Sequence, residues 1–281
     1  MSTSLLNRGG LLAVVTTLFM IGCDANSPSD TALVSLDLQP MVAGSALSAS
    51  PTTTYEIGGT LVTIEAARLI ISQITLIRAD GTEYLVETAP VSAPALNDAG
   101  ETVTHTFTEQ VVLAKHDLGE RIYELGELPA GSYTGVRMMV GLSGLTNRLD
   151  PTQVPATHAL TQQTDWSHHW KWSSGYIFVR LDGHSDADGN GTIEPEEGAW
   201  DLHVGMSNMA KVLEFNEPFS IKRGAAVELH FMVDYAKMIE NITDFSTVEG
   251  RNTHTMDNMP LAMQVVNDLQ AAFMLHGIHA E

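Results

Sequence analysis

Two adjacent histidines, His168 and His169, lie in a segment that holds three of the protein's four tryptophans. A third histidine, His203, follows shortly after the fourth tryptophan. Imidazole nitrogens are common ligands of copper, zinc, iron and nickel. These residue types and their spacing therefore predict a transition-metal site inside an aromatic shell. The alternative is a tryptophan-rich core whose indole N–H groups find hydrogen-bond acceptors. The three tryptophans of the segment are Trp166, Trp170 and Trp172.

A second stretch, residues 186–197, reads DADGNGTIEPEE and matches the twelve-residue calcium loop position by position. Its oxygen ligands suit Ca²⁺, and its glycine at the sixth position permits the sharp turn. A strand-like run precedes the loop, so we expect a structural clip between strands rather than an EF-hand sensor. The alternative is an acidic turn without an ion. The predicted calcium ligands are Asp186, Asp188, Asn190, Thr192 and Glu197.

Alternating hydrophobic residues predict the strands that must position these side chains. Apolar and polar residues alternate in 34–39 and 227–234, and residues 71–77 read as a strand followed by a turn at Gly81. A long segment, 147–164, then leads to the tryptophan–histidine cluster and has the length of a functional loop.

The C-terminal end shows a different period. Apolar residues at three- and four-residue spacing predict a helix that begins near Pro260 and includes Phe273. The predicted fold is mainly β: a single antiparallel β-sandwich over residues 32–281, with an inserted calcium loop and a C-terminal helix covering an edge or end.

The N-terminus predicts export and lipidation. Arg8 and the short apolar run 11–21 are typical of a signal peptide, residues 1–22, and Gly22-Cys23 resembles a lipobox. Residues 23–31 then form a tether beginning at a lipid-modified Cys23. We therefore expect the protein in the cell envelope, facing the periplasm and touching the membrane only through the lipid anchor.

Composition excludes several classes of protein. With 14 Lys+Arg against 34 Asp+Glu the formal charge is −20, which argues against nucleic acid as a partner. The single cysteine rules out a disulfide within the chain, and a blue-copper site needs a thiolate beside its histidines. No Gly-x-Ser-x-Gly motif appears, and no Ser-His-Asp order stands out. We expect no enzymatic activity.

The runs LTNRLDPTQVP, DWSHHWKWSSGYIFVRLDG and WDLHVGM together resemble the MbnP-like family of copper-associated extracytoplasmic proteins. A weaker similarity lies in RLIISQITLIRADGTEYLV. The family pattern places a histidine before Trp-x-Trp, matched here by His169, and a later His-Leu-Gly, matched by His203-Val204-Gly205. This chain lacks the cysteines that often follow in the family.

The resemblance implies one copper ion held by two histidines, with a kynurenine made from tryptophan as a third ligand. His169 and His203 are the first choice of ligands, with His168 as the rival, and the modified residue is Trp166, Trp170 or Trp172. A di-haem enzyme related to cytochrome c peroxidases would be the modifying partner. The implied function is copper acquisition, buffering or homeostasis. The alternative function is a calcium-stabilised binding or adhesion module with no copper role.

Overall fold

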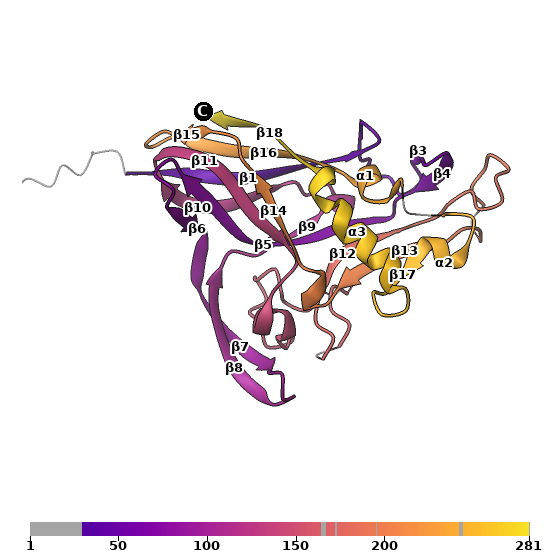
Figure 1. The fold of residues 1–281 in the computed structure, drawn as a ribbon, viewed down its shortest axis with the longest axis horizontal. Coiled ribbons are helices and arrows are strands. Elements are labelled where there is room, and N and C mark those ends of the chain that lie inside the picture. The colour runs from indigo at the N-terminus through magenta and orange to yellow at the C-terminus, as the bar shows by residue number, and fades with distance from the viewer. Residues whose placement is uncertain (1–29, 164–166, 172, 195, 242–243, 281) are drawn as a thin grey trace, which may run out of the picture.

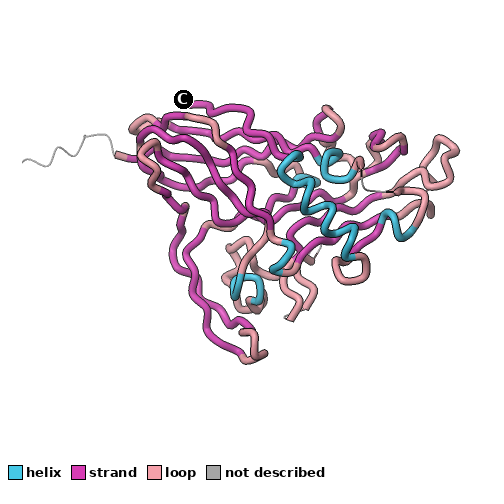
Figure 2. The backbone as a smooth tube through the Cα atoms, viewed as in Figure 1, coloured by secondary structure: helices cyan, strands magenta, loops and turns pink. Residues whose placement is uncertain are grey.

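The fold is mainly β, as predicted, and its strands form two principal sheets (Figure 1). The computed structural model describes residues 30–280 apart from 164–166, 172, 195 and 242–243. Figure 2 shows that strands make up most of this framework and that the helices are few. None of the described helices is long and apolar enough to cross a membrane. The predicted signal peptide and Cys23 lie outside the described residues.

The first sheet has the order β10-β1-β16-β18, with β2 paired to β1. Its strands are β1 (Thr31–Val42), β2 (Ser45–Ala46), β10 (Ile122–Pro129), β16 (Ala226–Asp234) and β18 (Phe273–Ala280). Most strand pairs are antiparallel, as predicted, but β1 and β16 run parallel. Parallel neighbours need a long crossover, and here most of the chain lies between the two strands.

The second sheet has the order β14-β11-β5-β12-β13-β17, with β15 paired to β11 and β6 and β9 paired to β5. A second parallel pair joins β13 and β17. Its strands are β5 (Ala66–Arg78), β6 (Glu83–Leu85), β9 (Val112–Lys115), β11 (Gly131–Val140), β12 (Ile177–Gly183), β13 (Trp200–Gly205), β14 (Lys211–Phe215), β15 (Phe219–Ile221) and β17 (Asn252–Thr253).

Two hairpins complete the strands: β3 (Thr54–Ile57) with β4 (Thr60–Thr63), and β7 (Glu87–Leu96) with β8 (Thr102–Glu109). The β7–β8 hairpin extends away from the body (Figure 1). Short 3₁₀ turns span His116–Leu118, Gly144–Arg148 and Ser207–Met209.

The core lies between the two principal sheets. Phe215 of β14 meets Phe231 of β16 edge to face, with ring centroids 4.9 Å apart. Strand β5 is buried along nearly its whole length, because it pairs with neighbours at both edges and is covered on both faces. This burial explains its near-continuous Ile, Leu and Ala content.

Three α-helices are described: α1 (Tyr235–Ile239), α2 (Val248–Arg251) and α3 (Met259–Ala272). The last is the predicted C-terminal helix. Asn258 caps it by accepting from the Leu261 amide, and Pro260 lies in its first turn. The prediction that Phe273 belongs to the helix is wrong, because Phe273 begins β18 and pairs with Val233 of β16. Backbone hydrogen bonds to the edge of β16 favour the extended conformation at Phe273 over the helix that its spacing predicted.

Candidate metal sites

The pairing of β12 with β13 gathers a set of polar side chains. Arg180 stands opposite His203. Asp182 Oδ1 accepts a hydrogen bond from His203 Nε2 over 2.8 Å, and its Oδ2 accepts one from Arg180 Nε over 2.8 Å. Burial raises the pKa of Asp182, but the hydrogen bond and charge of His203 and the charge of Arg180 lower it more. The carboxylate therefore stays ionised and holds the His203 imidazole in place.

His254 is a functional candidate that the sequence did not single out. Its ring meets that of His203 at 4.8 Å between centroids and nearly at right angles. Its Nδ1 lies 3.2 Å from Asp257 Oδ2 and 3.8 Å from Asp201 Oδ1. Burial raises the pKa of Asp201. Sequence spacing gives no signal for His254, because it arrives beside His203 only through the pairing of β17 with β13.

His169 lies at the approach to β12. It forms an isolated β-bridge with Tyr176, whose ring it meets edge to face at 4.8 Å. Its buried Nε2 finds no hydrogen-bond partner among the described residues. Burial lowers the pKa of His169, against the smaller raising effects of Asp150 and of a hydrogen bond to the Leu149 backbone. The ring is therefore neutral near pH 7, the form that binds metals.

His168 is also buried, at 4% exposure. Its carbonyl accepts a hydrogen bond from the Ile177 amide over 2.9 Å, which fixes the backbone beside the first residue of β12. Of the three tryptophans in this segment, Trp166 and Trp172 lie outside the described residues.

Trp170 connects the tryptophan–histidine segment to the end of β13. A methyl group on Gly205 would lie 2.8 Å from Cζ3 of the Trp170 ring and 2.3 Å from the Tyr176 carbonyl oxygen. The indole therefore packs directly on the glycine two residues beyond His203. The two segments that spacing predicted to form one site do meet in space.

The predicted long loop positions Tyr176. Asn147 Oδ1 accepts from the Tyr176 amide over 2.9 Å, and the Tyr176 hydroxyl donates to the Leu160 carbonyl over 2.7 Å. Gly175 has φ +80°, and a methyl group there would lie 2.4 Å from the Asn147 carbonyl oxygen. Only glycine fits this approach, which brings the loop against Tyr176, the bridge partner of His169.

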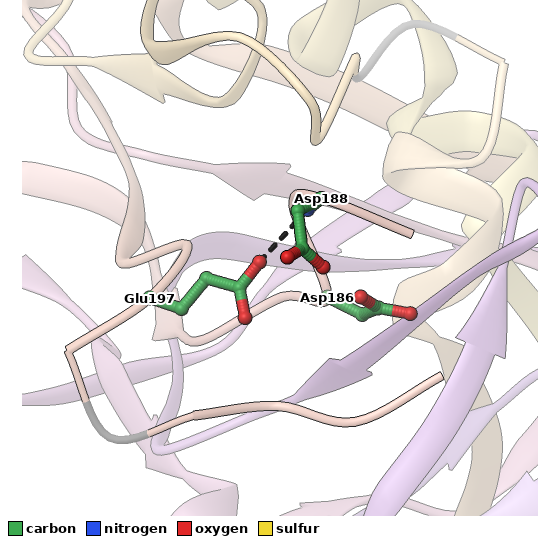
Figure 3. Close-up of side chains that lie close together, drawn as sticks. All are labelled: Asp186, Asp188 and Glu197. Atoms are coloured by element: carbon green, nitrogen blue, oxygen red, sulfur yellow. Dashed lines mark hydrogen bonds between the residues drawn. The ribbon is translucent and has the colours of Figure 1, made fainter. Parts of the chain in front are cut away.

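The predicted calcium loop connects β12 to β13. Oxygens of Asp186, Asp188 and Glu197 lie within 4.8 Å of one another (Figure 3). No other group of three or more His, Cys, Asp or Glu side chains in the described part of the chain converges as closely. Three of the five predicted calcium ligands thus come together.

Backbone amides orient these carboxylates. Asp186 accepts from the amides of Asn190 and Gly191 over 2.9 and 2.8 Å, and Glu197 accepts from the Asp188 amide over 2.8 Å. The Asn190 side-chain oxygen instead accepts from the Thr192 amide and hydroxyl. Asn190 and Thr192 therefore shape the turn beside the carboxylate group.

The base of the loop is closed by its own backbone and is fastened to β4. The Ser185 amide donates to the Gly198 carbonyl over 3.0 Å, and the Asp186 amide donates to the Leu61 carbonyl over 2.9 Å. His184 Nδ1 lies 2.9 Å from the Glu197 carbonyl oxygen. The loop thus closes the β12–β13 hairpin at the end opposite Gly205.

Comparison with known proteins gives one family. The family model named MbnP matches residues 31–259, which include the tryptophan–histidine segment, the acidic loop and His203. The chain is similar to the solved structure of MbnP from Methylosinus trichosporium, with 16% sequence identity and a TM-score of 0.49. That similarity covers 89% of this chain and 99% of the other. No curated protein matches the chain.

We predict that Gly205→Ala destabilises the fold by about 1–3 kcal/mol, because the added methyl group must displace the Trp170 ring or the Tyr176 carbonyl. Urea unfolding followed by circular dichroism measures the change. The matched control is Gly277→Ala, where the nearest atom would lie 4.0 Å away. Equal unfolding midpoints for the two variants would contradict the packing of Trp170 on Gly205.

Proposed function

The chain belongs to the MbnP family, and from this premise we propose that it binds a single copper ion through two histidines. Its role would be copper acquisition, buffering or homeostasis in the cell envelope, without catalysis of its own. The observation that carries the proposal is the buried His169 Nε2, which has no hydrogen-bond partner among the described residues. A buried nitrogen without a partner is costly, and a metal ion would satisfy it.

His169 has the arrangement of a metal ligand. Its Nε2 has no hydrogen-bond partner among the described residues, and burial lowers the pKa of the ring more than the Leu149 backbone raises it. In the tautomer with the proton on Nδ1, the Nε2 lone pair would be available to copper. His168, also buried, is the alternative ligand from the same segment.

His203 offers copper its other nitrogen. Because Nε2–H donates to the ionised Asp182, Nδ1 is the nitrogen whose lone pair would bind copper. A carboxylate that orients a ligating imidazole in this way is a common feature of metal sites. Asp182 would thus act as a positioning residue for copper bound at His203.

As the family resemblance implies, a kynurenine derived from tryptophan would supply the third ligand. Trp170 is the candidate with a described position, against Gly205. Trp166 and Trp172 remain candidates from the sequence. A di-haem enzyme of the cytochrome c peroxidase class would perform the oxidation.

We predict that the natively purified protein retains about one copper per chain through gel filtration, as expected for a site that encloses the ion with imidazole ligands. His169→Ala with His203→Ala should remove this copper without unfolding the protein, because the core and the acidic loop lie elsewhere. His105→Ala, which alters a half-buried histidine on β8, is the matched control. Metal analysis of the three proteins measures the difference.

Copper should also be retained as the pH falls toward about 6.5, the ordinary pKa of histidine, because the lowered pKa of His169 delays its protonation.

If His168→Ala removes the copper and His169→Ala does not, the ligand is His168. If the wild type holds no copper after exposure to it, the proposal is wrong, and the calcium-stabilised binding module becomes the better interpretation.

Oxidation of tryptophan predicts a mass change. Conversion of indole to kynurenine exchanges one carbon for one oxygen in the residue, a gain of about 4 Da. We expect it on one of Trp166, Trp170 and Trp172 in protein from the native host. Peptide mass spectrometry locates it, and protein made in a host without the di-haem enzyme is the control. Unmodified tryptophans in fully copper-loaded native protein would exclude kynurenine as a ligand.

We also propose that the acidic loop binds Ca²⁺. The ion binds only the folded protein, so calcium at 100 times its Kd would stabilise the fold by about 2.7 kcal/mol. A chelator should therefore lower the melting temperature of the wild type. Asp186→Asn with Glu197→Gln should abolish this dependence, whereas Glu196→Gln, at an exposed residue of the same loop, should preserve it. A wild-type melting temperature that is the same with and without the chelator would refute calcium binding.

Lipid anchoring at Cys23 would keep the protein in the envelope, facing the periplasm. We predict that the native protein partitions with membranes and that Cys23→Ser releases it or leaves it unprocessed. A cysteine that carries several acyl chains anchors a protein firmly in the membrane, whereas a single acyl chain binds the membrane only marginally. Fractionation followed by immunoblotting measures the partition. A wild-type protein found only in the soluble fraction would disprove the anchor.

A further inference from the structure

Three histidines gather on the outer face of the first sheet, away from the β12–β13 hairpin. The His230 ring on β16 lies 5.2 Å from that of His276 and 5.5 Å from that of His279, measured between centroids. His276 and His279 are exposed and His230 is half-buried. Both β18 histidines lie beyond the residues matched by the family model.

A β-bulge brings the two β18 histidines to one place. Residues three apart on a regular strand point to opposite faces. Here His230 pairs with Gly277 and Phe231 pairs with Leu275, so His276 is the extra residue of the bulge. A bulge redirects a side chain in this way. Gly277 carries no side chain, and a methyl group there would lie 4.0 Å from His279 Nε2, so the His279 ring lies near the residue that pairs with His230.

The His230 tautomer is set by its neighbours. Gln39 Oε1 lies 2.9 Å from His230 Nε2, and Asp37 Oδ2 lies 3.8 Å from the same nitrogen. Both are acceptors, so Nε2 carries the proton and Nδ1 has the lone pair. Burial lowers the pKa of His230, which keeps the ring neutral.

The two facing nitrogens have the spacing of metal ligands. His230 Nδ1 lies 3.4 Å from His279 Nε2, longer than an ordinary hydrogen bond. Two nitrogens that each bind a tetrahedral ion at about 2.0–2.1 Å stand about 3.4 Å apart. The separation of the two atoms is therefore that of two ligands on one ion.

We propose that His230 and His279 form a second, open site for a divalent transition-metal ion of the class that prefers imidazole: Cu²⁺, Ni²⁺ or Zn²⁺. His276 is near enough to add a third imidazole by rotating its exposed side chain. Gln39 and Asp37 are positioning residues that hold His230 in the ligating tautomer, as outer-shell acceptors do in other metal sites. The remaining coordination positions face solvent, so the ion can be exchanged.

This site does not depend on the proposed copper function. The test therefore uses the full chain, without a polyhistidine tag, in the background His169→Ala with His203→Ala. Saturating Ca²⁺ occupies the acidic loop, and Ni²⁺ is the probe in isothermal titration calorimetry. We expect one saturable Ni²⁺ site in this background.

Adding His230→Ala or His279→Ala should abolish the site, and Gln39→Ala should weaken Ni²⁺ binding about tenfold through loss of the tautomer restraint. His105→Ala in the same background is the matched control and should leave Ni²⁺ binding unchanged. Circular dichroism verifies that each variant is folded. The proposal is overturned if the background protein binds no Ni²⁺, if binding survives the joint loss of His230 and His279, or if His105→Ala abolishes it.

Discussion

The antiparallel pairing of β12 with β13 is the constraint on which the interior candidate sites depend. It sets Arg180 opposite His203 and allows Asp182 to bond both. A slip of one residue would turn every side chain of a strand to the other face. Such a slip is prevented on one side by β5, which pairs with the other edge of β12. At its two ends the hairpin is closed by the acidic loop and by the packing of Trp170 on Gly205.

Local patterns in the sequence predicted the parts of the fold that local physics decides. Alternation identified β1 and β16, and the twelve-residue loop motif identified three carboxylates that converge. The parallel pairing of β1 with β16 was missed because partners so far apart in sequence leave no local signal. The strand β18 was missed because Phe273 also fits a helical spacing, and only the free edge of β16 decides between the two structures.

The same limit applies to the sites. His169 and His203 could be selected because each lies in a run that resembles the family pattern. Asp182 and His254 could not, since each acquires its role from a neighbour on another strand or loop. The cluster around His230 depends on a bulge, and no residue type marks a bulge of this kind in advance. Sequence reasoning thus finds candidate residues that lie in motifs and misses those that strand pairing brings together.

The parallel partnership of β1 and β16 also has a consequence for the order of folding. Leu33 pairs with Ala226, so β1 lacks its neighbour on that side until most of the chain is available. Contacts of such high sequence separation slow folding because a long loop must close first. During that interval β1 presents an unpaired edge, which is a template for association with other chains. A chaperone that shields residues 31–42 would therefore protect the chain at its most vulnerable stage.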